Sequence, residues 1–91
     1  MNKVIKRDGT VANFNADKII NAINKAFIEV DGTLYETETS ESIAEDIQNM
    51  KKDLVSVEEI QDMIEEFLMQ SERKDVARAY IRYRYKKEIV R

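Results

Sequence analysis

The first eighteen residues constrain the fold of this chain more than any other stretch. Two short runs of β-type residues, 3–6 and 10–14, are joined at Asp8-Gly9. Asp-Gly between such runs is a strong signal for a β-hairpin with a two-residue type I′ turn, because that turn needs a positive φ at both central residues. A loop of this length predicts that Lys6 lies opposite Val11.

The end of the hairpin leads straight into a helix start, which makes this junction a candidate anion site. Either Asn15 or Asp17 can cap the helix. Lys6 and Arg7 lie beside the turn, so two cations and free backbone N–H groups would gather near a helix N-terminus. A purely structural hairpin that covers one end of a helical bundle, with both cations in solvent, explains the same pattern.

Two helices are predicted in the first half of the chain after the hairpin. The first has apolar residues at helical spacing up to residue 30 and ends near Gly32, a common C-terminal stop. The second starts near Thr39 or Ser40 and runs to about Lys52. Its apolar stripe is the narrowest of all, so it is the weakest of the predicted helices.

The second half predicts a short strand and two further helices. Residues 54–57 are apolar enough to add a third strand to the edge of the hairpin. Ser56 followed by Glu59 reads as a capping box, and the helix that follows has the clearest apolar stripe in the chain. The last helix opens at Ser71 or Asp75 and continues to the C-terminus. Four helices and a small sheet are therefore expected.

Length and pattern together predict one α+β domain over residues 1–91, a four-helix bundle capped by an N-terminal β-hairpin or small mixed sheet. The chain contains no Cys and no His, which excludes disulfides, thiol nucleophiles, imidazole bases and most transition-metal sites. Carboxylate chemistry with Mg²⁺ stays possible. Catalysis by this chain alone is therefore not expected, and a binding role is favoured.

The charges are unevenly distributed along the chain, although the net charge is only −3. Residues 1–25 carry a net +3, residues 26–70 a net −11 and residues 71–91 a net +5. If the two basic ends meet in space, they form a positive patch suited to a small polyanion. No apolar run approaches the roughly 18 residues that span a bilayer, and no signal peptide opens the chain. We therefore expect a cytoplasmic protein without a membrane partner.

Other sites are less well supported by the sequence. Neither common glycine-rich phosphate loop is present, so any nucleotide must be held by side chains and by the hairpin turn. The basic last helix with Tyr80, Tyr83 and Tyr85 resembles a nucleic-acid surface, but the acidic middle of the chain argues against one. The acids on the outer face of the third helix are more typical of a solvated surface than of a metal site, because metal ligands must converge.

Four blocks of sequence resemble the ATP-cone domain. They are residues 4–10 (Val-Ile-Lys-Arg-Asp-Gly-Thr), 14–19 (Phe-Asn-Ala-Asp-Lys-Ile), 57–62 (Val-Glu-Glu-Ile-Gln-Asp) and 77–84 (Ala-Arg-Ala-Tyr-Ile-Arg-Tyr-Arg). The resemblance covers nearly the whole chain in the right order. It implies an allosteric nucleotide-binding domain, regulatory rather than catalytic, with the fold expected above.

The closing helix is similar to that of anaerobic (class III) ribonucleoside-triphosphate reductases, enzymes of deoxyribonucleotide synthesis for DNA replication. The resemblance therefore implies the regulatory domain of such a reductase, with the catalytic domain of that enzyme as partner. In this family ATP raises the activity, and dATP lowers it by favouring an inhibited homo-oligomer. The effector would be ATP or dATP, normally arriving with Mg²⁺.

Nine residues match the family's nucleotide-site positions: Val4, Lys6, Arg7, Asn15, Lys18, Ile19, Val57, Gln61 and Lys86. By this resemblance, the four cations face the phosphates, while Val57 and Gln61 meet the base. Two positions depart from the family pattern: an acid on the second hairpin strand is Ala12 here, and a frequent threonine is Val57. No catalytic residue and no protein metal ligand is implied.

Two other functions remain open at this stage. An ATP-cone also occurs behind a zinc ribbon in a bacterial transcriptional repressor, which the absence of Cys disfavours. The chain could instead be a transcriptional regulator with a borrowed DNA-binding partner. It could also be a protein-interaction module that has kept the fold and lost nucleotide binding.

Overall fold

The computed structural model describes residues 3–50 and 53–89, with side-chain surroundings up to residue 86. The elements follow in the order β1 (Lys3–Ile5), β2 (Val11–Asn13), α1 (Ala16–Asp31), α2 (Glu38–Gln48), β3 (Leu54–Ser56), α3 (Val57–Gln70) and α4 (Lys74–Ile89). The α+β prediction, with four helices and a small mixed sheet, is confirmed.

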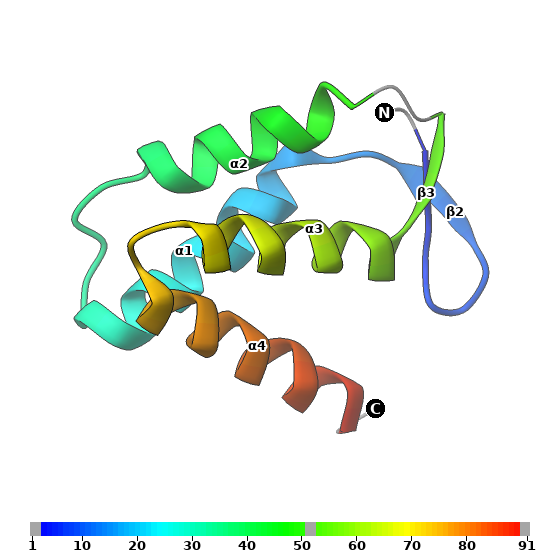
Figure 1. The fold of residues 1–91 in the computed structure, drawn as a ribbon. Coiled ribbons are helices and arrows are strands. Elements are labelled where there is room, and N and C mark those ends of the chain that lie inside the picture. Colours follow the sequence, from blue (N-terminus) through cyan, green and yellow to red (C-terminus); the bar gives the residue numbers. More distant parts are fainter. Residues whose placement is uncertain (1–2, 51–52, 90–91) are drawn as a thin grey trace.

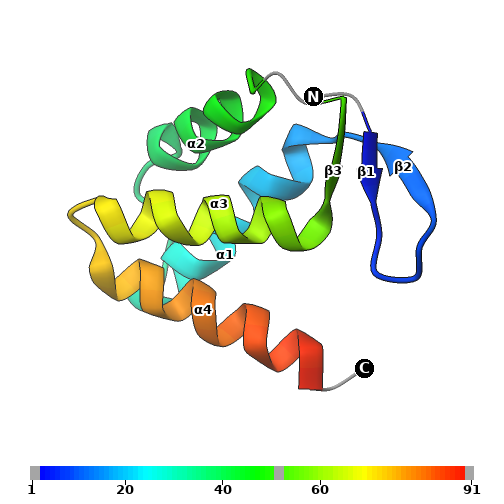
Figure 2. The ribbon, with the colours of Figure 1, turned by 45° about the vertical axis from the view of Figure 1, so that its right-hand side comes forward.

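The four helices form a bundle in which α2 and α4 lie on opposite sides (Figure 1). Helix α1 packs against both α2 and α4, and α3 also packs against both, more closely against α4. The sheet lies at one end of the bundle, beside the N-terminal ends of α1 and α3, as Figure 2 shows from a second direction. Across the described ranges, no helix is long and apolar enough to cross a membrane.

The sheet has the strand order β2-β1-β3. Strand β1 pairs with β2 in the antiparallel direction and with β3 in the parallel direction. The predicted third strand is thus confirmed. Because β3 ends where α3 begins, the pairing of β1 with β3 fixes the hairpin against the N-terminus of α3.

The predicted turn type at Asp8-Gly9 is wrong. Gly9 has φ +88°, but no described non-glycine residue has a positive φ, which excludes a type I′ turn. Instead Gly9 N–H donates to the carbonyl of Lys6 (2.9 Å), and Lys6 N–H donates to the carbonyl of Thr10 (2.8 Å). This is a three-residue loop, Arg7 to Gly9, that closes with a left-handed glycine.

Asp8 supplies the physical reason for the longer loop. Its Oδ1 accepts hydrogen bonds from the Thr10 backbone N–H (3.0 Å) and from the Thr10 hydroxyl (2.6 Å). Such an Asx turn competes with the conformation that a type I′ turn requires. The hydrogen bonds from Thr10 also hold the pKa of Asp8 below its ordinary value.

The longer loop shifts the pairing of the hairpin by one residue. Ile5 lies opposite Val11, so the predicted pairing of Lys6 with Val11 is wrong. Val4 pairs with Ala12 on one side and with Val55 on the other. These three residues share the face of the sheet that is turned toward the bundle, since successive side chains along a strand alternate between faces.

The helix boundaries follow local capping signals. Asn15, one of the two predicted caps, caps α1, its side chain accepting from the N–H of Asp17 (3.0 Å). Gly32 closes the helix in the left-handed conformation, as predicted. Ser56 caps α3 by accepting from the N–H of Glu59 (3.1 Å). Helix α4 begins at Lys74, between its two predicted starts.

Helix α2 differs most from the prediction. It begins at Glu38, one or two residues early, and ends at Gln48. The side chain at its N-cap, Thr37, makes no capping hydrogen bond. The predicted end near Lys52 is therefore wrong, because Asn49 caps the helix and Met50 already lies beyond it; residues 51 and 52 themselves lie outside the described residues.

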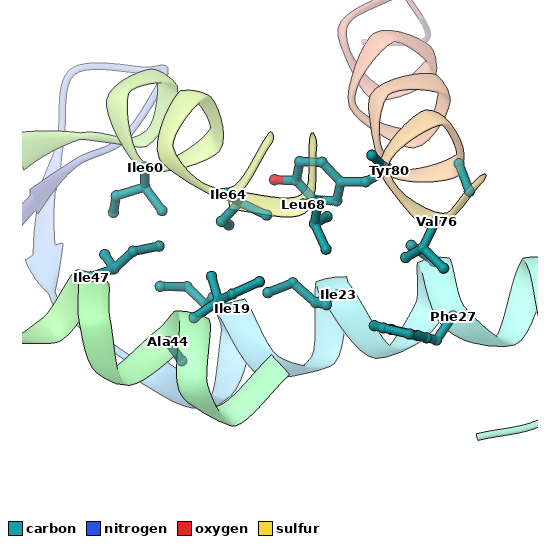
Figure 3. Close-up of a cluster of buried hydrophobic side chains, with 14 of the residues drawn as sticks. Ile19, Ile23, Phe27, Ala44, Ile47, Ile60, Ile64, Leu68, Val76 and Tyr80 are labelled. Atoms are coloured by element: carbon teal, nitrogen blue, oxygen red, sulfur yellow. The ribbon is translucent and has the colours of Figure 1, made fainter. Parts of the chain in front are cut away.

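The core lies between the four helices and draws on all of them (Figure 3). Ile23, Ile47, Leu68 and Val76 are completely inaccessible to solvent. Tyr80 is 2% exposed, and its ring extends from α4 toward α3 (Figure 3). Burial of its hydroxyl raises the pKa of Tyr80 well above its ordinary value, so the group stays neutral.

Two arginines connect the last helix to the rest of the bundle. Arg73, just before α4, makes a two-pronged contact with Asp31 at the end of α1 (2.7 and 3.2 Å). Its guanidinium also lies 5.5 Å from the ring centroid of Phe27. Arg84 pairs with Asp62 on α3 (2.8 Å). Helix α4 is thus attached to α1 at one end and to α3 farther along.

Candidate functional site

A cavity of about 470 Å³ opens where the sheet meets the bundle. The inner face of the hairpin contributes Val4 and Ala12, and residues of α1, α3 and α4 form the remaining walls. This volume falls within the range of ordinary small-ligand sites.

The α1 side of this cavity is basic. Lys18 and Lys25 line it from positions two turns apart on α1, and Lys6 joins them from the hairpin. No carboxylate is among the described residues that line it. None of the three lysines forms an ion pair with another described residue. The cavity therefore concentrates positive charge, which favours an anion.

The N-terminus of α1 lies at the same wall and adds to its positive potential. Asn15 lines the cavity and caps the helix. The first turn of a helix carries a partial positive charge from its backbone N–H groups, and phosphates are often bound there. The short path from the hairpin to Asn15 brings this helix end and Lys6 to one place.

The opposite side of the cavity is mostly apolar. Val57, Ile60 and Ile64 line it from α3, and they recur at the spacing that puts residues on one helix face. Ile19 of α1 and Val4 of β1 add further apolar surface. A flat apolar group fits this wall, while an anionic group fits the basic wall.

Gln61 is the polar group of the α3 wall. Its Oε1 accepts a hydrogen bond from Arg7 Nη2 in the hairpin turn (2.8 Å). Arg7 Nε also lies 3.7 Å from Oε1 of Glu58, one turn earlier on α3. Arg7 is not among the residues that line the cavity. Arg7 thereby connects the hairpin loop to the first two turns of helix α3.

Two tyrosines close the cavity on the side of α4. Tyr80 and Tyr83 both line it, with ring centroids 6.3 Å apart and planes tilted by 41°. Tyr80 belongs to the buried core as well, so core packing fixes this wall of the cavity.

Lys86 lines a second cavity, of about 560 Å³, between α1 and α4. The two cavities share Lys25 and Tyr83, so they are neighbours. Lys86 is exposed. It lies beside the first cavity and is not part of its wall.

The structure thus brings seven of the nine residues predicted from the resemblance to one cavity, namely Val4, Lys6, Asn15, Lys18, Ile19, Val57 and Gln61. Arg7 and Lys86 lie next to it. Sequence reasoning missed Lys25, although its spacing of seven from Lys18 places both on one helix face. It also missed the lining role of Tyr80 and Tyr83, which their aromatic spacing does not reveal.

The described part of the chain holds no group of three or more acids placed to bind a metal ion. The acids on the outer face of α3 form no such group either.

The ATP-cone domain family matches the chain over residues 2–89. No curated protein matches the sequence significantly.

Proposed function

The chain belongs to the ATP-cone family, and from that premise we propose that it is the allosteric ATP- and dATP-binding domain of an anaerobic ribonucleoside-triphosphate reductase. The family consists of nucleotide-binding regulatory domains, so this domain regulates and does not catalyse. The observation that carries the proposal is the cavity with three unpaired lysines on one wall and an apolar surface opposite.

In the proposed complex, the triphosphate lies against Lys6, Lys18 and the N-terminus of α1. Lys86 reaches the phosphates from the neighbouring cavity. The base lies on the α3 wall, against Val57 and Gln61. Mg²⁺ would be held by phosphate oxygens, because the described lining offers no carboxylate.

The closing helix supports the choice of parent enzyme. Residues 77–84 resemble the end of the ATP-cone in anaerobic reductases, and Ala77, Ala79 and Tyr80 of this block are buried in the core. The catalytic domain of the reductase is then the partner, and the regulated reaction is ribonucleotide reduction.

The surface charges support regulation through a homo-oligomer. Helix α2 exposes Glu38, Glu41, Glu45 and Asp46, and none of them makes an ion pair with another described residue. We call this set the acidic face. Helix α4 exposes the basic face, Arg78 and Arg82, of which Arg82 also lies 3.8 Å from Glu29 of α1.

These two faces cannot meet within one molecule, because α2 and α4 lie on opposite sides of the bundle (Figure 1). They can meet between two molecules, where the acidic face of one copy would lie against the basic face of the next. Such head-to-tail contacts form rings or longer assemblies. The pairing would be weakened by salt.

Nucleotide binding is tested by calorimetry of the nucleotide-free chain with ATP and dATP in the presence of Mg²⁺. We expect saturable binding of both, with an affinity that falls as salt rises, because the phosphates meet lysines. AMP should bind more weakly than ATP, since it has fewer charges to place on the basic wall. Absence of binding at millimolar nucleotide would refute the proposed function.

The oligomer is tested by charge reversal, with molecular mass measured by light scattering at low salt in the presence of dATP. Glu41→Lys with Glu45→Lys makes both faces basic, and Arg78→Glu with Arg82→Glu makes both acidic. Each variant alone should stay monomeric, because like charges would face each other. An equimolar mixture of the two should associate again. A mixture that stays monomeric, or single variants that associate like the wild type, would contradict this contact.

A further inference from the structure

The contact between Arg7 and Gln61 has a consequence for the base that the cavity accepts. The Arg7 side chain is only 16% exposed and lies on α3, with Nη2 2.8 Å from Oε1 of Gln61. The two residues are 54 positions apart in the sequence. The hairpin turn therefore reaches over the start of α3 and holds a side chain of the cavity wall.

This contact determines which end of the Gln61 amide is left for a ligand. A guanidinium carries only donors, so it can hold the amide only by the carbonyl oxygen. The Nε2 group, with two N–H donors, is then the end that has no hydrogen-bond partner among the described residues. Gln61 lines the cavity, and thus presents a hydrogen-bond donor to it.

We propose that Arg7 is a positioning residue that fixes Gln61 as a donor and so makes the cavity select a purine with an unprotonated ring nitrogen at N1. Adenine has this nitrogen. With Nε2 opposite N1 and Oε1 opposite the C6 substituent, adenine pairs with both ends of the amide, its amino group donating to the second lone pair of Oε1. Hypoxanthine and guanine carry N1–H and a C6 carbonyl, which would oppose both ends. The inference rests on the proposed function, in which the base lies on the α3 wall.

The arrangement of the walls determines the edge of the base that meets Gln61. The lysines come from α1 and the hairpin, while Gln61 comes from α3 on the other side. A nucleotide whose phosphates lie on the lysines turns the edge opposite its sugar toward α3. In a purine, this edge carries N1 and the C6 substituent.

The experiment compares ATP with inosine triphosphate, which differs at this edge alone. Calorimetry should show that the wild type binds ATP at least about tenfold more tightly, because one hydrogen bond is lost and two donors oppose each other. Arg7→Met should reduce this preference severalfold, since the free amide can turn its oxygen to N1–H. Gln61→Glu should shift the preference toward inosine triphosphate, because a carboxylate only accepts.

Glu58→Gln is the matched control. It removes the 3.7 Å ion pair with Arg7 and leaves the hydrogen bond between Arg7 and Gln61 in place. Its preference for ATP should equal that of the wild type. Circular dichroism of each variant establishes that it is folded.

Two outcomes would overturn the inference, and they differ in what else they refute. If Arg7→Met weakens both nucleotides equally and Gln61→Glu leaves the ratio unchanged, Arg7 acts on the phosphates and the positioning role is wrong, while nucleotide binding stands. If the wild type binds neither nucleotide, the proposed function fails together with the inference.

Discussion

Replacing Lys18 with alanine is expected to weaken ATP binding by about ten- to a hundredfold. Lys18 lies on the cavity wall at the first turns of α1, where no described carboxylate neutralises it. A hydrogen bond to a charged group contributes about 1.5–3 kcal/mol, and each 1.4 kcal/mol is tenfold in affinity. Isothermal calorimetry at fixed ionic strength measures the change.

Lys3→Ala is the matched control for Lys18. It removes the same charge from the same end of the molecule, but Lys3 is exposed and lines neither of the two cavities. Its affinity for ATP should change less than about twofold, which is the scale of screened surface charge. Equal losses in the two variants would mean that the overall charge, and not a phosphate contact, governs binding.

Leu68→Ala is expected to lower the free energy of unfolding by about 3–5 kcal/mol. Leu68 is completely inaccessible and lies between α1, α3 and α4 in the core (Figure 3). Truncation loses the transfer free energy of the buried atoms and leaves a cavity, and such losses are large in a small domain. Equilibrium unfolding in urea measures the effect.

Met69→Ala tests whether that loss depends on burial. Met69 is the next residue on the same helix and is 41% exposed. Its truncation should cost less than about 1 kcal/mol, because little packed surface is removed. Similar losses for Leu68 and Met69 would contradict the placement of the core.

The hairpin shows which structural features a local sequence pattern predicts and which it does not. Asp8-Gly9 predicts a turn at the correct place, because few residue pairs tolerate a reversal there. The turn type depends on a competition that the dipeptide alone does not decide, namely the hydrogen bonds of Asp8 with Thr10. The outcome moves the register by one residue, and with it the choice of residues that face the bundle.

The candidate site likewise has parts that the sequence predicts and parts that it does not. Asn15 and Ser56 are recognisable helix caps, so the two helix starts beside the sheet follow from local rules. The lysines on α1 could be placed on one face by their spacing. The bond between Arg7 and Gln61 could not be predicted, because it depends on the path of a three-residue loop and on the parallel pairing of β1 with β3.

Tyr80 gives the last helix a part in any response to a bound molecule. One side of its ring belongs to the core that holds α3 and α4 together, and the residue also faces the cavity. A ligand that presses on this ring shifts a group to which both helices are already packed. The wall nearest α4 therefore joins the cavity to the helix that presents the basic face, because one side chain both packs in the core and lines the cavity.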